Sequence, residues 1–161
     1  MARIKKQLIH PLMGMLFLAG SVFLASCTAT VGLYEKTASF ASHEWSSDNK
    51  PSFTFEITDT VHPYQLYFVL RHTDAYRYKN IWVNIQVKSP DSTYTVSRQF
   101  NLADGEKWLG SGMDDVFEHR IAFSRAPGLL KKGSYTFELR QVMREDPLQH
   151  VLNAGIRIEK Q

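Results

Sequence analysis

The chain has 161 residues, of which 43% are hydrophobic and 22% are charged, with one cysteine and a formal net charge of +3. One cysteine excludes a disulfide within the chain, so the folded part must be stabilised by packing. The basic surplus comes from Arg3, Lys5 and Lys6; without them, 16 basic residues balance 16 acidic ones. Because no Lys/Arg-rich run follows these three residues, we expect no nucleic-acid partner.

The N-terminus has the pattern of a bacterial export signal. The three basic residues precede an apolar run of 13 residues, 12–24, and Ala25, Ser26 and Cys27 follow. A membrane-spanning helix needs about 20 apolar residues, so this run is typical of a signal peptide. Small residues before a cysteine form a lipobox. We therefore predict that residues 1–26 are a lipoprotein signal peptide and that Cys27 is acylated; the alternative is an ordinary secretory signal with an incidental cysteine.

Acyl chains on Cys27 would anchor the mature protein to a membrane, because each buried CH₂ contributes about 0.8 kcal/mol. The residues that follow, 28–32, are small and uncharged. We expect residues 27–33 to form the lipidated cysteine and a short tether, and residues 34–161 to form a single domain. A domain of this size is long enough to bury about two thirds of its unfolded surface.

Strict alternation of apolar and polar residues recurs along the domain, which is the pattern of half-buried strands. Turn-forming Gly, Pro, Asp and Ser residues separate most of the alternating segments. The fold class predicted is all-β, an antiparallel two-sheet β-sandwich of about seven to eight strands. We expect only minor helical turns, at 114–119 and 147–152. Seven candidate strands lie at 53–57, 66–72, 81–88, 94–102, 121–123, 135–140 and 156–159.

Two residues stand out against this alternation. Arg98 falls on the apolar side of its strand, where it would need a carboxylate partner or an interface; the alternative is a β-bulge that turns it outward. Trp82 falls on the polar side of its strand. An exposed tryptophan on a sheet can stack on a sugar ring or anchor a protein partner, and partial burial under a loop is the alternative.

A first polar cluster, residues 72–79, follows the strand at 66–72. His72 and Asp74 lie on one face if the strand continues, so Asp74 would be placed to orient the imidazole, and Tyr76 follows. No partner nucleophile is identifiable. We therefore favour a structural polar pair over an acid/base pair.

A second polar cluster, residues 108–120, begins at Trp108 and contains four potential metal ligands in six residues: Asp114, Asp115, Glu118 and His119. Their spacing matches neither an EF-hand loop nor a His-Glu-x-x-His helix, and the adjacent Arg120 would compete for the carboxylates. We expect no metal here. The favoured interpretation is that the acidic residues cap backbone amides and pair with arginine.

A third polar cluster, residues 143–150, contains Arg144, Glu145 and Asp146 before Pro147, which indicates a turn. All three clusters lie at strand ends or in connections, where binding residues gather on a sandwich. We expect them to converge, either as a partner-binding surface with aromatic anchors or as a structural network of buried pairs.

These clusters, taken in order, resemble the gliding-motility lipoprotein H family. The likeness runs from about Tyr34 to Lys160 and is strengthened by the lipobox. The segments that carry it are His72-Thr73-Asp74-Ala75-Tyr76, Asn80-Ile81-Trp82, Trp108-Leu109-Gly110 with Gly112-Met113-Asp114-Asp115, Phe117-Glu118-His119-Arg120, and Met143-Arg144-Glu145-Asp146-Pro147-Leu148 with His150.

The resemblance implies a cell-envelope lipoprotein needed for gliding, which acts beside other lipoproteins and proteins of the gliding and secretion machinery. It implies no catalytic activity and no cofactor, and it carries over only one residue role, lipidation at Cys27. The rivals are a carbohydrate-binding envelope lipoprotein and a metal-dependent hydrolase. Residues 28–30 contain no acid beside Cys27, so we favour the outer membrane, facing the periplasm.

Overall fold

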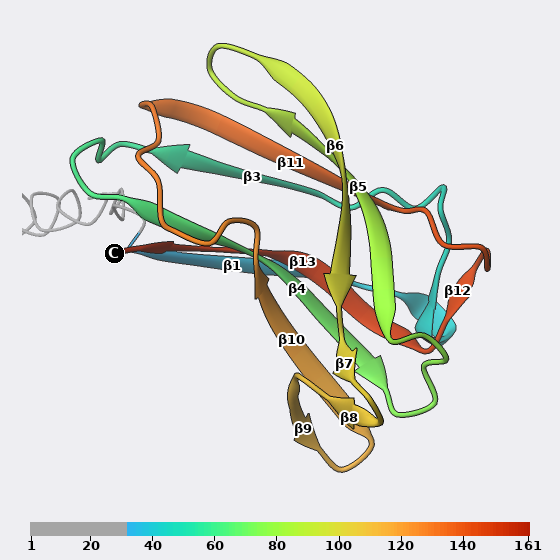
Figure 1. Ribbon diagram of the computed structural model, residues 1–161. Helices are drawn as coiled ribbons and strands as arrows, with labels where there is room; N and C mark the ends of the chain where they lie inside the picture. The colour runs from blue at the N-terminus through green and yellow to red at the C-terminus, as the bar shows by residue number, and fades with distance from the viewer. Residues whose placement is uncertain (1–31) are drawn as a thin grey trace, which may run out of the picture.

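A computed structural model describes residues 32–161, and these form a β-structure (Figure 1). The predicted signal peptide and Cys27 lie outside the described residues. The tether expected at 27–33 also lies outside them except for its last two residues, and Leu33 already begins a strand. Within 32–161 the one helix is a 3₁₀ turn, Ala41–His43, and no helix there is long and apolar enough to span a bilayer.

Two larger antiparallel sheets form the body of the domain. The first has the order β1-β13-β4-β10-β9, and the second has the order β3-β11-β5-β6. The strands of the first sheet are β1 (Leu33–Ser39), β4 (Tyr64–Thr73), β9 (Ser111–Met113), β10 (Val116–Ala122) and β13 (Val151–Lys160). Those of the second sheet are β3 (Ser52–Ile57), β5 (Asn80–Lys88), β6 (Thr93–Asn101) and β11 (Gly133–Gln141).

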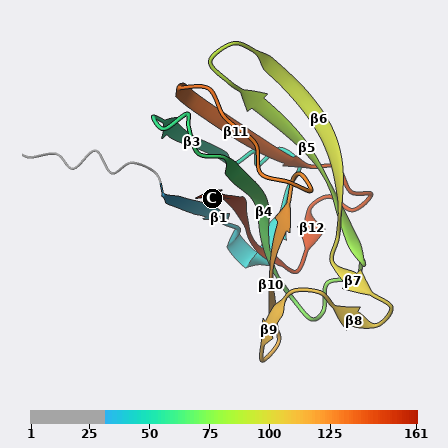
Figure 2. The same ribbon diagram turned by 60° about the vertical axis from the view of Figure 1, so that its left-hand side comes forward.

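Two further sheets have only two strands each. In one, β2 (Glu44–Trp45) pairs with β12 (Leu148–Gln149); in the other, β7 (Ala103–Asp104) pairs with β8 (Lys107–Trp108). The β7–β8 hairpin and β9 lie together at one end of the domain, at the bottom of the view in Figure 2.

The two larger sheets share one hydrophobic core. Alternate residues of β3, β5 and β11 are buried, as their alternation predicts. Aromatic contacts bridge the sheets: the ring of Phe68 on β4 stacks on Phe100 of β6 at a centroid distance of 4.5 Å, and Tyr34 on β1 lies 5.5 Å from Phe55 of β3. The fold is therefore stabilised by apolar packing between the faces of the two sheets.

The all-β, antiparallel prediction is confirmed, but the number of strands and sheets was wrong. The structure has thirteen strands in four sheets within residues 32–161. Five of the strands that we missed have only two or three residues, too few to show an alternation. The sixth, β1, is an edge strand whose sequence, LYEKTAS, has no regular apolar face.

The two predicted helical turns were also wrong. Asp114 has a positive φ of 56° and forms a turn with Asp115, after which β10 begins at Val116 and pairs with β4. Residues 147–152 divide between β12 and the start of β13, separated by His150 at a φ of 68°. A residue in the left-handed region interrupts a right-handed helix, and strand pairing then satisfies the backbone groups.

Arg98 lies on the inner side of its strand, as the alternation predicts, but the expectation that it would be buried there was wrong. Its side chain is exposed, and the β5–β6 register runs without a bulge from Asn80 to Lys88. The reason is that β6 is the edge strand of its sheet. Of its inner-face residues, only Phe100 is fully covered by the opposite sheet.

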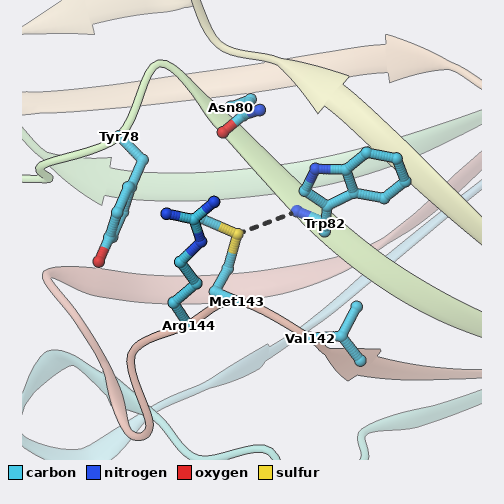
Figure 3. A pocket seen from close by; sticks show the side chains of 6 residues that line it. All are labelled: Tyr78, Asn80, Trp82, Val142, Met143 and Arg144. Atoms are coloured by element: carbon cyan, nitrogen blue, oxygen red, sulfur yellow. Dashed lines mark hydrogen bonds between the residues drawn. The ribbon is translucent and has the colours of Figure 1, made fainter.

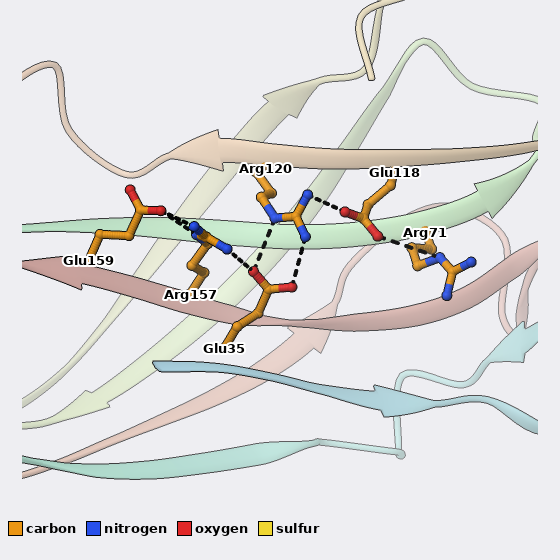
Figure 4. Close-up of polar contacts among 6 residues, drawn as sticks. All are labelled: Glu35, Arg71, Glu118, Arg120, Arg157 and Glu159. Atoms are coloured by element: carbon orange, nitrogen blue, oxygen red, sulfur yellow. Dashed lines mark hydrogen bonds and ion pairs between the residues drawn. The ribbon is translucent and has the colours of Figure 1, made fainter. Parts of the chain in front are cut away.

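The outer face of the five-stranded sheet carries a continuous chain of ion pairs (Figure 4). Glu35 on β1 is at its centre: it accepts two hydrogen bonds of 3.0 Å from Arg120 and one of 2.7 Å from Arg157. Arg120 also pairs with Glu118, which lies 3.7 Å from the Nε of Arg71. Alternating charges thus cover this face of the sheet.

Candidate functional site

A groove opens at the junction of β5 with the segment that follows β11 (Figure 3). Its volume is about 460 Å³, and it contains aromatic, apolar, amide and guanidinium groups. The side chains that line it are those of Tyr78, Asn80, Trp82, Val142, Met143 and Arg144.

Hydrogen bonds that involve the backbone connect the two sides of this groove. The N–H of Val142 donates to the carbonyl of Trp82 at 3.0 Å, and the N–H of Trp82 donates to the thioether sulfur of Met143 at 3.2 Å. The buried Gln141 accepts from the N–H of Met143 at 2.8 Å and donates to Asp146 at 3.2 Å. Asp146 in turn accepts a hydrogen bond of 2.8 Å from the N–H of Ser47. The groove is therefore fixed on a rigid strand end.

Trp82 is 41% exposed and Val142 is 37% exposed, so both present apolar surface to a ligand. The exposure of Trp82 agrees with its place on the polar side of β5. Figure 3 shows Met143 and Arg144 between Tyr78 and the indole of Trp82. The groove thus has one aromatic side chain on each side, with a flexible apolar residue and a cation between them.

Beside the groove lies a buried pair of histidines. The Nε2 atoms of His72 on β4 and His119 on β10 are 2.9 Å apart, and both side chains are nearly inaccessible. Burial lowers the pKa of His119 to about 4, with a further contribution from His72, and burial also lowers the pKa of His72. Both rings are neutral at pH 7.

The hydrogen bonds assign a tautomer to each ring. The carbonyl of Thr73 can only accept, so the Nδ1–H of His72 donates to it at 2.7 Å. The neutral ring of His72 must then accept at Nε2, and the Nε2–H of His119 is the donor. The pair therefore acts as a structural link between β4 and β10.

Aromatic side chains and a glycine enclose the histidine pair. The rings of Trp108, Tyr76 and Phe117 lie 4.5, 5.0 and 5.9 Å from that of His72. A Cβ on Gly110 would lie 2.5 Å from the carbonyl oxygen of Glu118 and 2.9 Å from the ring of His119, so only glycine fits there.

The pairing that we expected between His72 and Asp74 was wrong. Asp74 is exposed in the turn after β4, where its backbone N–H donates to the carbonyl of Asp115 at 2.7 Å. His72 points into the core instead and pairs with His119, because β4 ends at Thr73 and the alternation does not continue to Asp74.

The four potential metal ligands of the second cluster do not converge. Asp114 and Asp115 are exposed in the turn before β10, while Glu118 and His119 project from opposite faces of that strand. Glu118 pairs with Arg71 and Arg120, and His119 pairs with His72.

The three polar clusters meet at one end of the domain. The N–H of Thr73 donates to the carbonyl of His150 at 3.0 Å, and Arg77 lies 3.6 Å from Glu145. Tyr76 contacts Tyr78 edge-to-face at 5.8 Å, which connects the buried histidine pair to the groove. The buried members, His72, Tyr76 and His119, belong to the core; Trp82 and Arg144 line the groove.

Sequence reasoning missed Tyr78, Asn80, Val142 and Met143 as lining residues. Tyr78 and Asn80 flank the start of β5, and Val142 and Met143 follow the end of β11 directly. The available signal was that β11 ends next to the start of β5, and recognising it requires knowledge of the strand order.

Comparisons with known proteins identify the family of the chain. The family model described as "GldH lipoprotein" matches residues 32–158. "Gliding motility lipoprotein GldH homolog" of Christiangramia forsetii is 28% identical over 128 residues, covering 73% of this chain and 78% of that protein. "Gliding motility lipoprotein GldH" of Flavobacterium johnsoniae is 24% identical over 156 residues, covering 91% and 95%.

Among solved structures, dimeric latent PorU from Porphyromonas gingivalis has a TM-score of 0.37 and 13% identity to this chain. The match covers 85% of this chain and 13% of PorU. Because the family model covers most of the sequence, the chain belongs to the GldH lipoprotein family, whose members are tied to gliding motility and whose name implies a lipid-anchored protein of the cell envelope.

Proposed function

We propose that this protein is a non-catalytic component of the gliding-motility apparatus that binds another envelope protein through the groove at Trp82. The observation that carries the proposal is the groove's composition. Trp, Tyr, Met and Arg are the residues enriched at the centres of protein interfaces, and Trp82, Tyr78, Met143 and Arg144 come together there. Its rigid support suits a preformed binding site.

The absence of catalysis is part of the proposal. His72, which the sequence suggested for acid/base chemistry, and His119, which it suggested as a metal ligand, are buried and hydrogen-bonded to each other. Glu118, which precedes His119 in the sequence, is paired with Arg71 and Arg120. We infer that these groups stabilise the fold beneath the groove, and that affinity comes from the groove itself.

We further propose that acyl chains on Cys27 hold the domain at the inner leaflet of the outer membrane, facing the periplasm. The lipobox and the lipoprotein family support the anchor. Changing Cys27 to Ser should leave uncleaved or soluble protein, and protease treatment of intact cells should leave the wild-type domain undigested. Membrane-bound, processed Cys27→Ser protein would refute the acyl anchor, whereas digestion of the wild type in intact cells would refute the periplasmic orientation alone.

The test of the binding role is site-specific photo-crosslinking in living cells. A photoreactive amino acid at Trp82 or Val142 should give one discrete adduct with another envelope protein. The same amino acid at Leu129, which is exposed on a distant loop, is the matched control and should give none. A Trp82→Ala/Arg144→Glu variant, expressed in place of the wild type, should abolish colony spreading at normal protein level. Normal spreading without an adduct would overturn the proposal.

A second candidate function is carbohydrate binding, which the exposed indole of Trp82 favours. Aromatic faces stack on sugar rings, and Asn80 and Arg144 supply hydrogen-bond donors in the same groove. In affinity electrophoresis, envelope polysaccharide in the gel should slow the wild-type protein and leave Trp82→Ala unaffected. Equal mobility of both proteins with and without polysaccharide would remove this candidate.

A further inference from the structure

One edge of the four-stranded sheet is open. The strand β6 pairs with β5 on one side over its full nine residues, and within residues 32–161 no strand pairs with its other side. The view in Figure 2 shows β6 along the outer margin of the molecule. Beyond Asn101 the margin is closed, because the N–H of Leu109 donates to the carbonyl of Leu102 at 2.8 Å.

The ladder with β5 determines which backbone groups face this open edge. The N–H of Ser89 donates to the carbonyl of Ser92, and the N–H of Leu102 donates to the carbonyl of Lys79. In an antiparallel ladder, hydrogen-bonded residues alternate, so the even-numbered residues of β6 bond to β5. The N–H and C=O groups of the odd-numbered residues, from Thr93 to Asn101, therefore point outward without a strand partner.

The edge has few of the features that prevent strand pairing. Natural sheets protect exposed edges with charged side chains, proline, bulges or very short strands. The segment from Thr93 to Asn101 is nine residues long and has no lysine, proline or bulge, so the single charge of Arg98 is its one protective feature. Tyr94, at 52% exposure, and the half-buried Val96 add apolar surface beside the open backbone groups.

We propose that this edge pairs with the same edge of a second copy of the chain, in an antiparallel register centred on Ser97. This interface is distinct from the groove at Trp82 and does not depend on it. The two four-stranded sheets would become one sheet of eight strands across a two-fold axis. In this register every outward backbone group between Thr93 and Asn101 gains a partner.

In this register the side chains of β6 in one copy can pack against those of β6 in the second copy. On the inner face, Tyr94 lies opposite Phe100 of the second copy, and Arg98 lies opposite Val96 of the second copy. On the outer face, Thr95 lies opposite Gln99 and Ser97 opposite itself, which are polar pairs suited to cross-strand hydrogen bonding. A register centred on Arg98 would place two arginines directly opposite each other, and like charges there are destabilising. A register centred on Ser97 keeps the two arginines apart and pairs the full length of β6.

The pairing fits a membrane-anchored protein. A single strand pair buries little surface, so we expect weak association of free domains in solution. Tethering two copies to one membrane raises their effective concentration and allows a weak interface to form.

Thiol crosslinking of the lipidated, full-length protein in membranes tests this interface. Because Cys27 is the only natural cysteine and its sulfur would be blocked by the proposed lipid, Ser97→Cys supplies one new thiol. A short bis-maleimide should join two Ser97→Cys chains into a species of twice the mass. Arg140→Cys, exposed on the central strand β11, is the control and should remain monomeric.

Charge variants at Val96 test the register with the backbone intact. In the Ser97→Cys background, Val96→Glu faces Arg98 of the second copy and should raise the crosslinked fraction severalfold. Val96→Lys faces the same arginine and should lower it severalfold. Because Val96 is half-buried, the two charge variants should lose melting temperature equally, and their yields are compared with each other. Equal crosslinking of Ser97→Cys and Arg140→Cys, an adduct with a different protein, or identical yields from the two charge variants would each overturn the proposal.

Discussion

The Nε2 atoms of His72 and His119 share one hydrogen bond of 2.9 Å in the interior of the domain, although 47 residues separate them in the sequence. The bond requires a neutral His72, because a protonated His72 would place a second N–H toward the N–H of His119. A protonated pair would also be a buried, uncompensated charge. The bond therefore makes the fold sensitive to acid.

We predict that the free energy of unfolding falls as the pH is lowered from about 6.5 to about 4. The pKa of His119 in the folded protein is about 4, below its ordinary value of 6.5, because the ring is buried. The unfolded state binds the proton first, so the stabilisation is complete above pH 6.5 and is lost as the pH falls toward 4. At 1.36 kcal/mol per pKa unit the loss is at most about 3 kcal/mol. Urea unfolding at each pH measures it.

A glutamine variant separates this effect from general acid denaturation. His119→Gln keeps a donor for His72 but removes one titrating group, so its stability should fall less between pH 6.5 and 4 than that of the wild type. His43→Gln, at an exposed position, should retain the wild-type slope. Parallel curves for wild type and His119→Gln would contradict the assignment.

Gly110→Ala should destabilise the fold. The added Cβ would lie 2.5 Å from a backbone oxygen and 2.9 Å from the His119 ring, neither of which can move without disturbing β10. Overpacking of this kind costs about 1–3 kcal/mol, which corresponds to a fall of several degrees in melting temperature. Gly128→Ala is the control, because a Cβ there meets nothing within 4 Å. Equal melting temperatures for the two variants would show that the β8–β9 segment can shift.

Much of the sandwich could be predicted from the sequence because period-two alternation reports which strand face is buried. β3, β5 and β11 alternate strictly and were located by this pattern. Arg98 shows where the pattern fails: alternation gives the face of a strand but not its position in the sheet, and the inner face of an edge strand is only partly covered. Strand order depends on long-range pairing, which a local pattern does not contain.

The candidate site was less predictable, for the same reason. His72 and His119 each appeared in a polar cluster, but their contact depends on the register of β10 against β4, in which Phe117 lies opposite His72. Sequence proximity favoured Asp74 as the partner instead. Trp82 was identifiable because its exposure follows from alternation alone, whereas Val142 and Met143 join it only through the pairing of β11 with β5.

Glu35→Gln should weaken the domain by about 1 kcal/mol at low salt. The hydrogen bonds from Arg120, and then those from Arg157, hold the pKa of Glu35 below its ordinary value, so the stabilisation exists above pH 4.5 and is lost as the pH falls further. A neutral amide removes the central charge of the network. The loss should shrink in 1 M salt, where the screening length is about 3 Å.

Urea unfolding at two salt concentrations measures this difference, and Glu56→Gln, exposed on β3, is the matched control. The pH range also distinguishes Glu35 from the histidine pair. As the pH falls, the stability from the histidine pair is lost between about 6.5 and 4, whereas that from Glu35 is lost below 4.5. A loss that is the same at both salt concentrations would show that Glu35 acts through packing instead of charge.

Substitution of Trp82, which lines the groove, and of Trp108, which packs against the core, should separate binding from stability. Trp108 packs against the core, with its ring 4.5 Å from that of His72 and 5.7 Å from that of Phe117. Trp108→Ala should therefore lower the unfolding free energy by about 2 kcal/mol, less than for a fully buried tryptophan. Trp82→Ala removes a side chain from the exposed side of β5 and should cost about 1 kcal/mol or less, since its backbone bonds to Val142 and Met143 remain.

Melting temperature and photo-crosslinking at Val142, measured on the same preparations, check this contrast. Trp82→Ala should lose the adduct at a nearly unchanged melting temperature, because affinity depends on its exposed ring. Trp108→Ala should show the larger fall in melting temperature and keep the adduct wherever the domain is folded, because Trp108 supports the histidine pair and does not line the groove. If Trp82→Ala unfolds the domain as readily as Trp108→Ala, the indole of Trp82 belongs to the fold and the groove is not the binding surface.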